Sequence, residues 1–169
     1  MIKKINYNLI TLFVFTGLIQ KHRGTWASLF TTIFLFLVLK VLNISVIFIS
    51  FLILIIFFYS LYAIKECLQD FKDEDPQQIV IDEFIGQSIP ICLYELFHNN
   101  NSNNLYESLQ IYFWFFLLFR LFDGLKPFPI DYIDRKYKNS LGIVFDDVLA
   151  GIYVVLCLIL FMIGKTFFY

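Results

Sequence analysis

The sequence lacks the residue patterns of several common catalytic sites. It has three cysteines, Cys67, Cys92 and Cys157. They form no C-x-x-C pair, none is followed by the glycine-rich turn and arginine of a cysteine phosphatase, and we expect them to be reduced. The only histidines are His22, in a basic cluster, and His98, beside an asparagine run. Ser28 has no histidine partner, and no Ser-Gly-His arrangement exists. These absences exclude Ser-His-Asp and PAP2-type catalysis.

Charge is also scarce, and long apolar runs take its place. Only 16% of the residues are charged, the net charge is −1, and no basic stripe is present, so nothing indicates nucleic-acid binding. The chain is 59% hydrophobic, whereas soluble domains are nearer half. The apolar residues form unbroken runs and do not alternate, which favours membrane helices over a barrel. The sequence therefore predicts an all-α fold, a small polytopic membrane helical bundle, with one domain over residues 1–169.

The runs and the polar breaks between them place the expected helices. These cover Leu29–Leu39, Val46–Ile64, Ile79–Phe97, Leu105–Phe122 and Val148–Ile163, with a turn near Val41–Ser45. Met1–Ile19 is too short to span and predicts an interfacial or re-entrant helix. Asp73–Pro76 predicts a turn, and His98–Asn104 predicts an exposed loop. Because most lysines and arginines lie in loops beside the acidic residues, the positive-inside rule predicts that this charged face is cytoplasmic.

Five acidic residues stand at the borders of the apolar helices: Asp82, Glu83, Asp123, Asp146 and Asp147. At the bilayer centre each would cost about 2.5–3.5 kcal/mol. We therefore expect them at the interface, in a polar cavity, or neutralised by a cation, for which hard carboxylate ligands favour Mg²⁺ over Zn²⁺. Adjacent aspartates point about 100° apart on a helix, so one of Asp146 and Asp147 is expected outside the direct ligands.

Arg120, Lys126 and Arg135 supply positive charge near these acids. Arg120 and Asp123 share a helix face, the spacing repeats at Lys126, and Pro127 stops the helix. Carboxylates for a metal together with basic groups for phosphate oxygens are typical of a phosphoryl-transfer site. From the residues alone, a set of interfacial salt bridges is an equal alternative.

Gly24–Ser28 precedes the Leu29–Leu39 run. Thr25 or Ser28 is expected to cap the following helix. The free N–H groups of such a helix start also bind phosphate, which makes Thr25 and Ser28 candidate phosphate-binding residues.

At these positions the sequence resembles the phosphatidylglycerophosphatase A family. The matching pieces, in the family's order, are G-T-W-A-S from Gly24, D-P-x-x-I-V-I-D-E-F-I-G from Asp75, F-R-L-F-D-G-L-K-P-F-P-I from Phe119, D-R at Asp134, and G-I-V-F-D-D-V-L-A-G from Gly142. The sequence departs from the family where Arg23 and Ala27 stand in place of a proline and a glycine.

The resemblance implies a Mg²⁺-dependent lipid phosphatase of the bacterial inner membrane. Such an enzyme converts phosphatidylglycerophosphate to phosphatidylglycerol in phospholipid biosynthesis, from the cytoplasmic face, with the bilayer and the lipid as its partners and no protein partner implied. Its acidic motif residues fall on Asp82, Glu83, Asp123, Asp146 and Asp147, which serve as both catalytic and metal residues. Its basic motif residues fall on Arg120, Lys126 and Arg135.

Two alternatives belong to other classes. A CDP-alcohol phosphotransferase also uses Mg²⁺ and several aspartates, and Asp123-Gly124 fits part of its D-G-x-x-A-R signature, but the A-R pair is absent. A small transporter or non-catalytic membrane subunit would use the charges to line a path or a partner surface.

Overall fold

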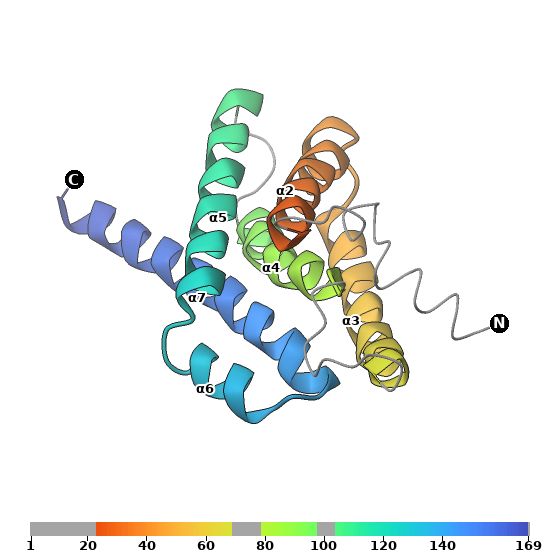
Figure 1. Cartoon of the computed structure of the whole chain (residues 1–169). Coiled ribbons are helices and arrows are strands. Elements are labelled where there is room, and N and C mark those ends of the chain that lie inside the picture. Colours follow the sequence, from red (N-terminus) through yellow and green to blue (C-terminus); the bar gives the residue numbers. More distant parts are fainter. Residues whose placement is uncertain (1–22, 69–78, 98–103, 169) are drawn as a thin grey trace.

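The computed structural model describes residues 23–68, 79–97 and 104–168, and every regular element in them is helical (Figure 1). The elements are α2 (Arg23–Phe36), η2 (Leu37–Val41), α3 (Val46–Leu68), α4 (Ile81–Phe97), α5 (Leu105–Leu125), α6 (Ile130–Lys136) and α7 (Ser140–Phe168). The prediction of an all-α bundle is confirmed. The predictions for Met1–Ile19, for the turn at Asp73–Pro76 and for most of the loop from His98 fall outside the described residues.

Within the described residues, four helical stretches are long and apolar enough to cross a membrane: Arg23–Val41, Val46–Glu66, Leu105–Leu125 and Ser140–Gly164. Their outer faces carry large apolar side chains that a protein in water would cover; Ile47 is 70% exposed and Phe161 72%. These side chains need a lipid environment, as the unbroken apolar runs predict. Cys92 and Cys157 are unpaired, in agreement with the expectation of reduced cysteines.

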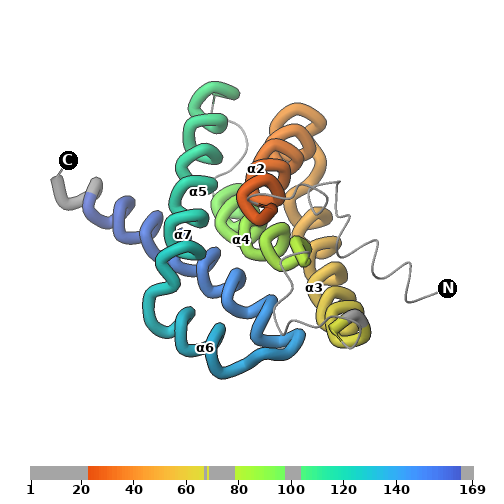
Figure 2. The backbone as a smooth tube through the Cα atoms, in the orientation of Figure 1, coloured from red at the N-terminus to blue at the C-terminus, as the bar shows by residue number. Residues whose placement is uncertain are grey.

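Helix α4 forms the centre of the bundle. It packs against α2, α3, α5 and α7, and most of its side chains are buried (Figures 1 and 2). The predicted break near Val41–Ser45 is confirmed, because η2 ends at Val41 and α3 begins at Val46. The chain passes back and forth between the two ends of the bundle, so the starts of α2, α4 and α7 lie at the same end as the last turn of α5.

Four helices extend further than the sequence predicts: α2 begins at Arg23, α3 continues to Leu68, and the extensions of α5 and α7 carry charged residues of the site. Helix α5 continues past Phe122 to Leu125, and the next residue, Lys126, has a left-handed backbone (φ 42°) before Pro127. Helix α7 begins at Ser140, not at Val148. Its start is fixed by the side chain of Asn139, which accepts a hydrogen bond from the backbone N–H of Gly142 at 2.9 Å.

The end of the bundle away from these charged turns has its own buried ion pair. Lys40 Nζ, in the π-helical stretch η2, lies 2.8 Å from Glu95 Oε2, and the two side chains are 9% and 0% exposed. The hydroxyl of Tyr112 donates to Glu95 Oε1 at 3.1 Å. Glu95 is twelve residues beyond Glu83 on α4, which corresponds to about 18 Å along the helix axis.

Candidate metal and phosphate site

Three carboxylates from two helices converge at the charged end of the bundle. Asp82 and Glu83 lie in the first turn of α4, and Asp147 lies in the second turn of α7. One ligand oxygen from each lies within 4.8 Å of the others, which is a separation that one cation can bridge. Asp82 and Asp147 are buried, at 9% and 4% exposed, and Glu83 is partly buried.

A close crossing of α4 and α7 sets this geometry. A Cβ atom added to Gly86 would lie 2.5 Å from the backbone oxygen of Asp147, and one added to Gly151 would overlap the backbone oxygen of Gly86. Only glycine leaves room for backbones this close. Glu83 lies three residues before Gly86, and Asp147 lies four residues before Gly151. The contact therefore brings their side chains to the same place.

The cluster is electrostatically unfavourable without a compensating charge. The pKa of Glu83 lies well above its usual value, first because the carboxyl is buried and second because Asp82, Asp147 and Asp123 are nearby. Glu83 Oε2 is buried and accepts no hydrogen bond from the described residues. An orphaned carboxylate oxygen among other carboxylates is the environment that a divalent cation relieves.

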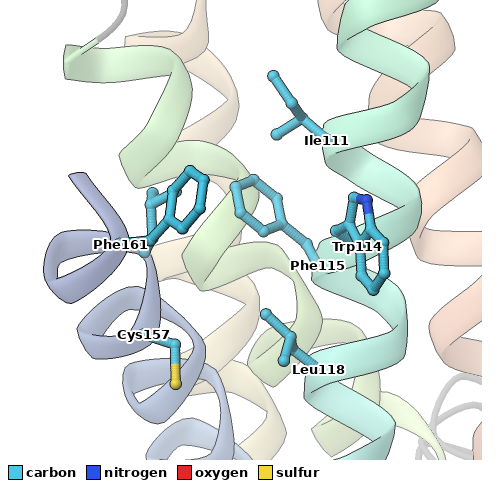
Figure 3. A pocket seen from close by; sticks show the side chains of 7 residues that line it. Ile111, Trp114, Phe115, Leu118, Cys157 and Phe161 are labelled. Carbon is cyan, nitrogen blue, oxygen red and sulfur yellow. The ribbon is translucent and has the colours of Figure 1, made fainter. Parts of the chain in front are cut away.

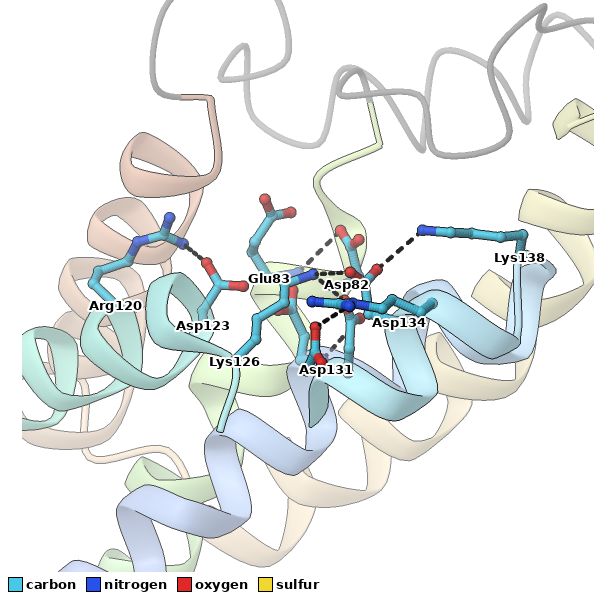
Figure 4. Close-up of polar contacts among 11 residues, drawn as sticks. Asp82, Glu83, Arg120, Asp123, Lys126, Asp131, Asp134 and Lys138 are labelled. Carbon is cyan, nitrogen blue, oxygen red and sulfur yellow. Dashed lines mark hydrogen bonds and ion pairs between the residues drawn. The ribbon is translucent and has the colours of Figure 1, made fainter. Parts of the chain in front are cut away.

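Arg120 approaches the cluster from the side of α2 and α5. Its guanidinium lies 2.9 Å from Asp123 Oδ2, and it donates to Ser28 Oγ at 3.3 Å (Figure 4). Asp123 lies close enough to Glu83 and Asp147 to interact electrostatically with both. A Cβ atom on Gly24 would collide with Glu83 Oε1, so the first turn of α2 lies directly against the carboxylates.

Lys126 makes the second basic contact. Its ammonium lies 2.9 Å from Asp146 Oδ2 and 3.2 Å from Asp134 Oδ2 (Figure 4). Burial alone would lower the pKa of Lys126, but these two carboxylates raise it above its usual value. Lys126 is therefore held charged, at a fixed place beside the carboxylate cluster. Its left-handed backbone directs the side chain there, between the end of α5 and the start of α7.

The structure divides the predicted acidic residues into two groups. Asp82, Glu83 and Asp147 form the cluster, and Asp123 adjoins it. Asp146 points elsewhere, to Lys126, as expected for adjacent residues on a helix.

The predicted basic and hydroxyl residues differ in where they lie. Arg120 and Lys126 adjoin the cluster, whereas the side chain of Arg135 is 78% exposed and pairs with Asp131 at 2.7 Å. The expectation that Thr25 or Ser28 caps a helix is wrong, because α2 already includes Arg23 and both residues lie within it. The Ser28 hydroxyl donates to the Gly24 carbonyl at 2.8 Å, a common bond within helices.

The sequence does not predict the role of Asp134, which pairs with both Lys126 and Lys138 (Figure 4). The D-R piece at Asp134 and Arg135 contains the signal. The sequence prediction names Arg135 because a phosphate site needs positive charge. The structure shows that the aspartate of the pair makes the contact with the basic site residue.

Comparison with known proteins gives matches over most of the chain. The sequence profile of the family described as Phosphatidylglycerophosphatase A matches residues 9–162. The protein named Phosphatidylglycerophosphatase A from Haemophilus influenzae is 38% identical over 141 residues, which cover 83% of this chain and 79% of that protein. The protein of the same name from Escherichia coli K12 is 31% identical over 105 residues, covering 62% of this chain and 54% of that protein.

A third relative carries a different name. A Bacteroides thetaiotaomicron protein named "Putative phosphatidylinositol-3-phosphatase" is 30% identical over 106 residues, covering 60% of this chain and 58% of that protein. No solved structure matches the chain. The profile covers nearly the whole chain, and the Haemophilus protein aligns over most of both sequences, so this chain belongs to the phosphatidylglycerophosphatase A family of phosphatases.

Proposed function

We propose that this protein hydrolyses the phosphate monoester of phosphatidylglycerophosphate, giving phosphatidylglycerol and inorganic phosphate, with Mg²⁺ as its cofactor. In this proposal residues 1–169 form one membrane-embedded phosphatase domain that serves bacterial phospholipid biosynthesis. The observation that carries the proposal is the cluster of Asp82, Glu83 and Asp147 at the end of an apolar bundle, beside Arg120 and Lys126.

The donor set fits a hard divalent cation. It contains only carboxylate oxygens, one of which, Glu83 Oε2, is buried without a hydrogen-bond partner among the described residues. Asp82, Glu83 and Asp147 would hold the ion, and Asp123 adjoins them as a further ligand or a hydrogen-bond partner. A bound Mg²⁺ supplies Lewis acidity and lowers the pKa of a coordinated water.

The basic residues bind and orient the phosphate. Arg120 and Lys126 provide donors for its oxygens, and each is fixed by a carboxylate, Asp123 for Arg120 and Asp146 for Lys126. Ser28 positions Arg120 by accepting its N–H. Thr25 on the same turn of α2 and the exposed Arg135 are proposed as weaker contacts with the incoming phosphate.

The reaction itself exchanges one P–O bond for another. The oxygen of water bonds to phosphorus, the bond from phosphorus to the ester oxygen breaks, and that oxygen takes a proton to become the free hydroxyl of phosphatidylglycerol. Trapping of a phosphoenzyme from labelled substrate would assign the attack to an aspartate instead of water.

The charged end of the bundle also indicates how the protein is oriented in the membrane. The apolar helices keep the acyl chains of the lipid in the bilayer, and the phosphate meets the site at the interface. We propose a multi-pass protein of the bacterial inner membrane with this end facing the cytoplasm, because basic residues of the charged loops are retained on that side.

The direct test is phosphate release from phosphatidylglycerophosphate by the purified protein, with Mg²⁺ and with a chelator. Wild-type protein should release phosphate only with Mg²⁺. Asp82→Asn and Asp147→Asn should abolish turnover while the protein still inserts in membranes. Glu107→Gln is the matched control, because Glu107 is exposed in the first turn of α5, at the end of that helix away from Arg120. Chelator-resistant activity, or full activity of Asp147→Asn, would contradict the proposal.

The same preparation separates the alternatives. Release of CMP from a CDP-lipid would indicate a phosphotransferase, and solute flux in liposomes without phosphatase activity would indicate a transporter. Phosphatidylinositol 3-phosphate should be assayed in parallel, because one relative is named for that substrate. Faster hydrolysis of the inositol lipid would change the proposed substrate but leave the proposed chemistry unchanged.

A further inference from the structure

Several apolar grooves lie between the helices on the outer surface of the bundle. The α2–α5 groove has a volume of about 340 Å³. Its walls include Leu29, Ile33 and Phe36 from α2 and Leu109, Phe113 and Phe116 from α5. The hydroxyls at its border are occupied internally: Thr32 donates to the backbone of Ser28, and Tyr112 donates to Glu95. The groove therefore presents hydrocarbon surface.

The charged end of this groove opens directly at the candidate phosphate site. Leu29 follows Ser28 in the chain, and Phe116 lies one helical turn before Arg120. Arg120 spans the two walls at this point, since it extends from α5 to donate to Ser28 Oγ on α2 at 3.3 Å. Its side chain is 24% exposed, so a positive charge accessible from outside stands at the end of an apolar channel.

Three other grooves lined by described residues lack such a connection to a basic residue of the site. The α5–α7 groove, about 420 Å³ and bordered by Ile111, Leu118 and Cys157, is shown in Figure 3. Between it and the charged end, the rings of Phe122 and Tyr153 pack with centroids 5.3 Å apart.

Two further grooves also differ from the α2–α5 groove. The α3–α4 groove, about 370 Å³, reaches Ile85 and Val148 near the carboxylates, but its lining contains no arginine or lysine that could bind a phosphate. The α4–α7 groove begins at Pro90, seven residues beyond Glu83, or about 10 Å along the axis.

We propose that the α2–α5 groove binds one acyl chain of the lipid substrate while Arg120 contacts a phosphate of the same molecule. The inference rests on the proposed function and adds to it the route by which the lipid reaches the site. In the lipid, an anionic phosphate adjoins an apolar acyl chain. In the protein, the cationic Arg120 adjoins the apolar groove in the matching order. Leu29 to Phe36 spans about 10 Å of helix, so the groove holds the part of the chain nearest the headgroup.

The first test fills the groove and compares substrates with and without acyl chains. Ile33→Trp should raise the KM for long-chain phosphatidylglycerophosphate about tenfold, a small effect for an apolar pocket because the surrounding lipid is equally apolar. It should leave kcat for the lipid unchanged, and it should alter no constant for the deacylated substrate glycerophosphoglycerophosphate, which has no chain to place in the groove. Ile111→Trp is the matched control, because it makes the same substitution in the α5–α7 groove. Equal effects of the two variants, or equal loss with both substrates, would overturn the proposal.

A second test does not require turnover. A phosphatidic acid with a photoreactive acyl chain is crosslinked to the wild-type protein in vesicles of neutral lipid. We expect labelling of peptides from α2 and α5, with competition by excess unlabelled phosphatidic acid and loss in Ile33→Trp. Uniform labelling of all grooves would mean that the probe reports only bulk lipid. If only the groove between α2 and α5 stayed unlabelled, a protein segment would cover it. Either result overturns the proposal. If the wild-type protein releases no phosphate, the proposed function fails. The labelling experiment still tests whether the groove binds an acyl chain.

Discussion

Replacing Gly86 by alanine tests whether the α4–α7 crossing positions the carboxylates. The added Cβ would lie 2.5 Å from the backbone oxygen of Asp147 and 2.8 Å from its carbonyl carbon. Carbon and oxygen normally approach no closer than about 3.3 Å. The two helices must therefore separate by close to 1 Å, which moves Asp147 away from Glu83.

The expected cost to activity is larger than the cost to stability. A displacement of about 1 Å at a catalytic constellation typically lowers the rate about 100-fold. Overpacking of this kind lowers the stability by about 1–3 kcal/mol, and the better helix propensity of alanine offsets about 1 kcal/mol of that loss. Gly86→Ala should therefore remain folded, require a higher Mg²⁺ concentration, and lose most of its kcat/KM.

The assay is phosphate release in mixed micelles over a Mg²⁺ titration, with thermal unfolding measured on the same preparation. Gly164→Ala is the control, because it lies on α7 with no atom within 4 Å of the added Cβ. It should retain full activity and be slightly more stable. Wild-type activity and Mg²⁺ affinity in Gly86→Ala would refute the reasoning that this contact sets the separation of the carboxylates.

Three further predictions follow from other contacts. Asp147→Asn should weaken Mg²⁺ binding measured by titration, whereas Asp146→Asn should leave it intact and lower kcat/KM about 10–100-fold, because Asp146 only fixes Lys126. Glu95→Gln should cost about 3–5 kcal/mol in unfolding experiments because it leaves Lys40 buried and unpaired, and adding Lys40→Met should recover most of that. Burial alone would raise the pKa of Asp134, but Lys126 and Lys138 lower it. The stability that Asp134 contributes is therefore fully present above the unfolded-state pKa of about 4 and is lost as the pH falls through the lower folded-state pKa. Asp134→Asn should reduce the dependence of the thermal unfolding temperature on acid pH.

The apolar bundle could be predicted from the sequence because the cost of exposing backbone in lipid leaves few choices. Long unbroken runs specify helices, and the break before Val46 was visible from Asn43 and Ser45. The start of α7 was placed too late. In the sequence, Asp146 and Asp147 resemble the border of the helix, whereas the Asn139 cap starts α7 earlier and places both aspartates inside it.

The residues of the site could be chosen from the sequence, but their pairing could not. Charge and spacing alone gave no reason to join Asp147 to Glu83 and Asp146 to Lys126; that division follows from the glycine contact between α4 and α7. Arg135 and Asp134 are adjacent in the chain, yet only the aspartate reaches Lys126. The pair of Lys40 and Glu95 was missed because two residues far apart in the sequence gave no local sign of contact.

The carboxylate cluster and the tight helix crossing act as one unit. Like charges brought together at the end of a buried helix would normally separate, and a separation of the two helices would relieve both the repulsion and the burial of Glu83. Here the short contacts at Gly86 and Gly151 belong to the packed interface of α4 with α7, so separation would also open the apolar core behind them. Without separation, the repulsion is relieved either by a proton, as the raised pKa of Glu83 indicates, or by a positive charge between the carboxylates. Arg120 and Lys126 are already paired with Asp123 and Asp146, so under the proposed function that charge comes from a cation bound among Asp82, Glu83 and Asp147.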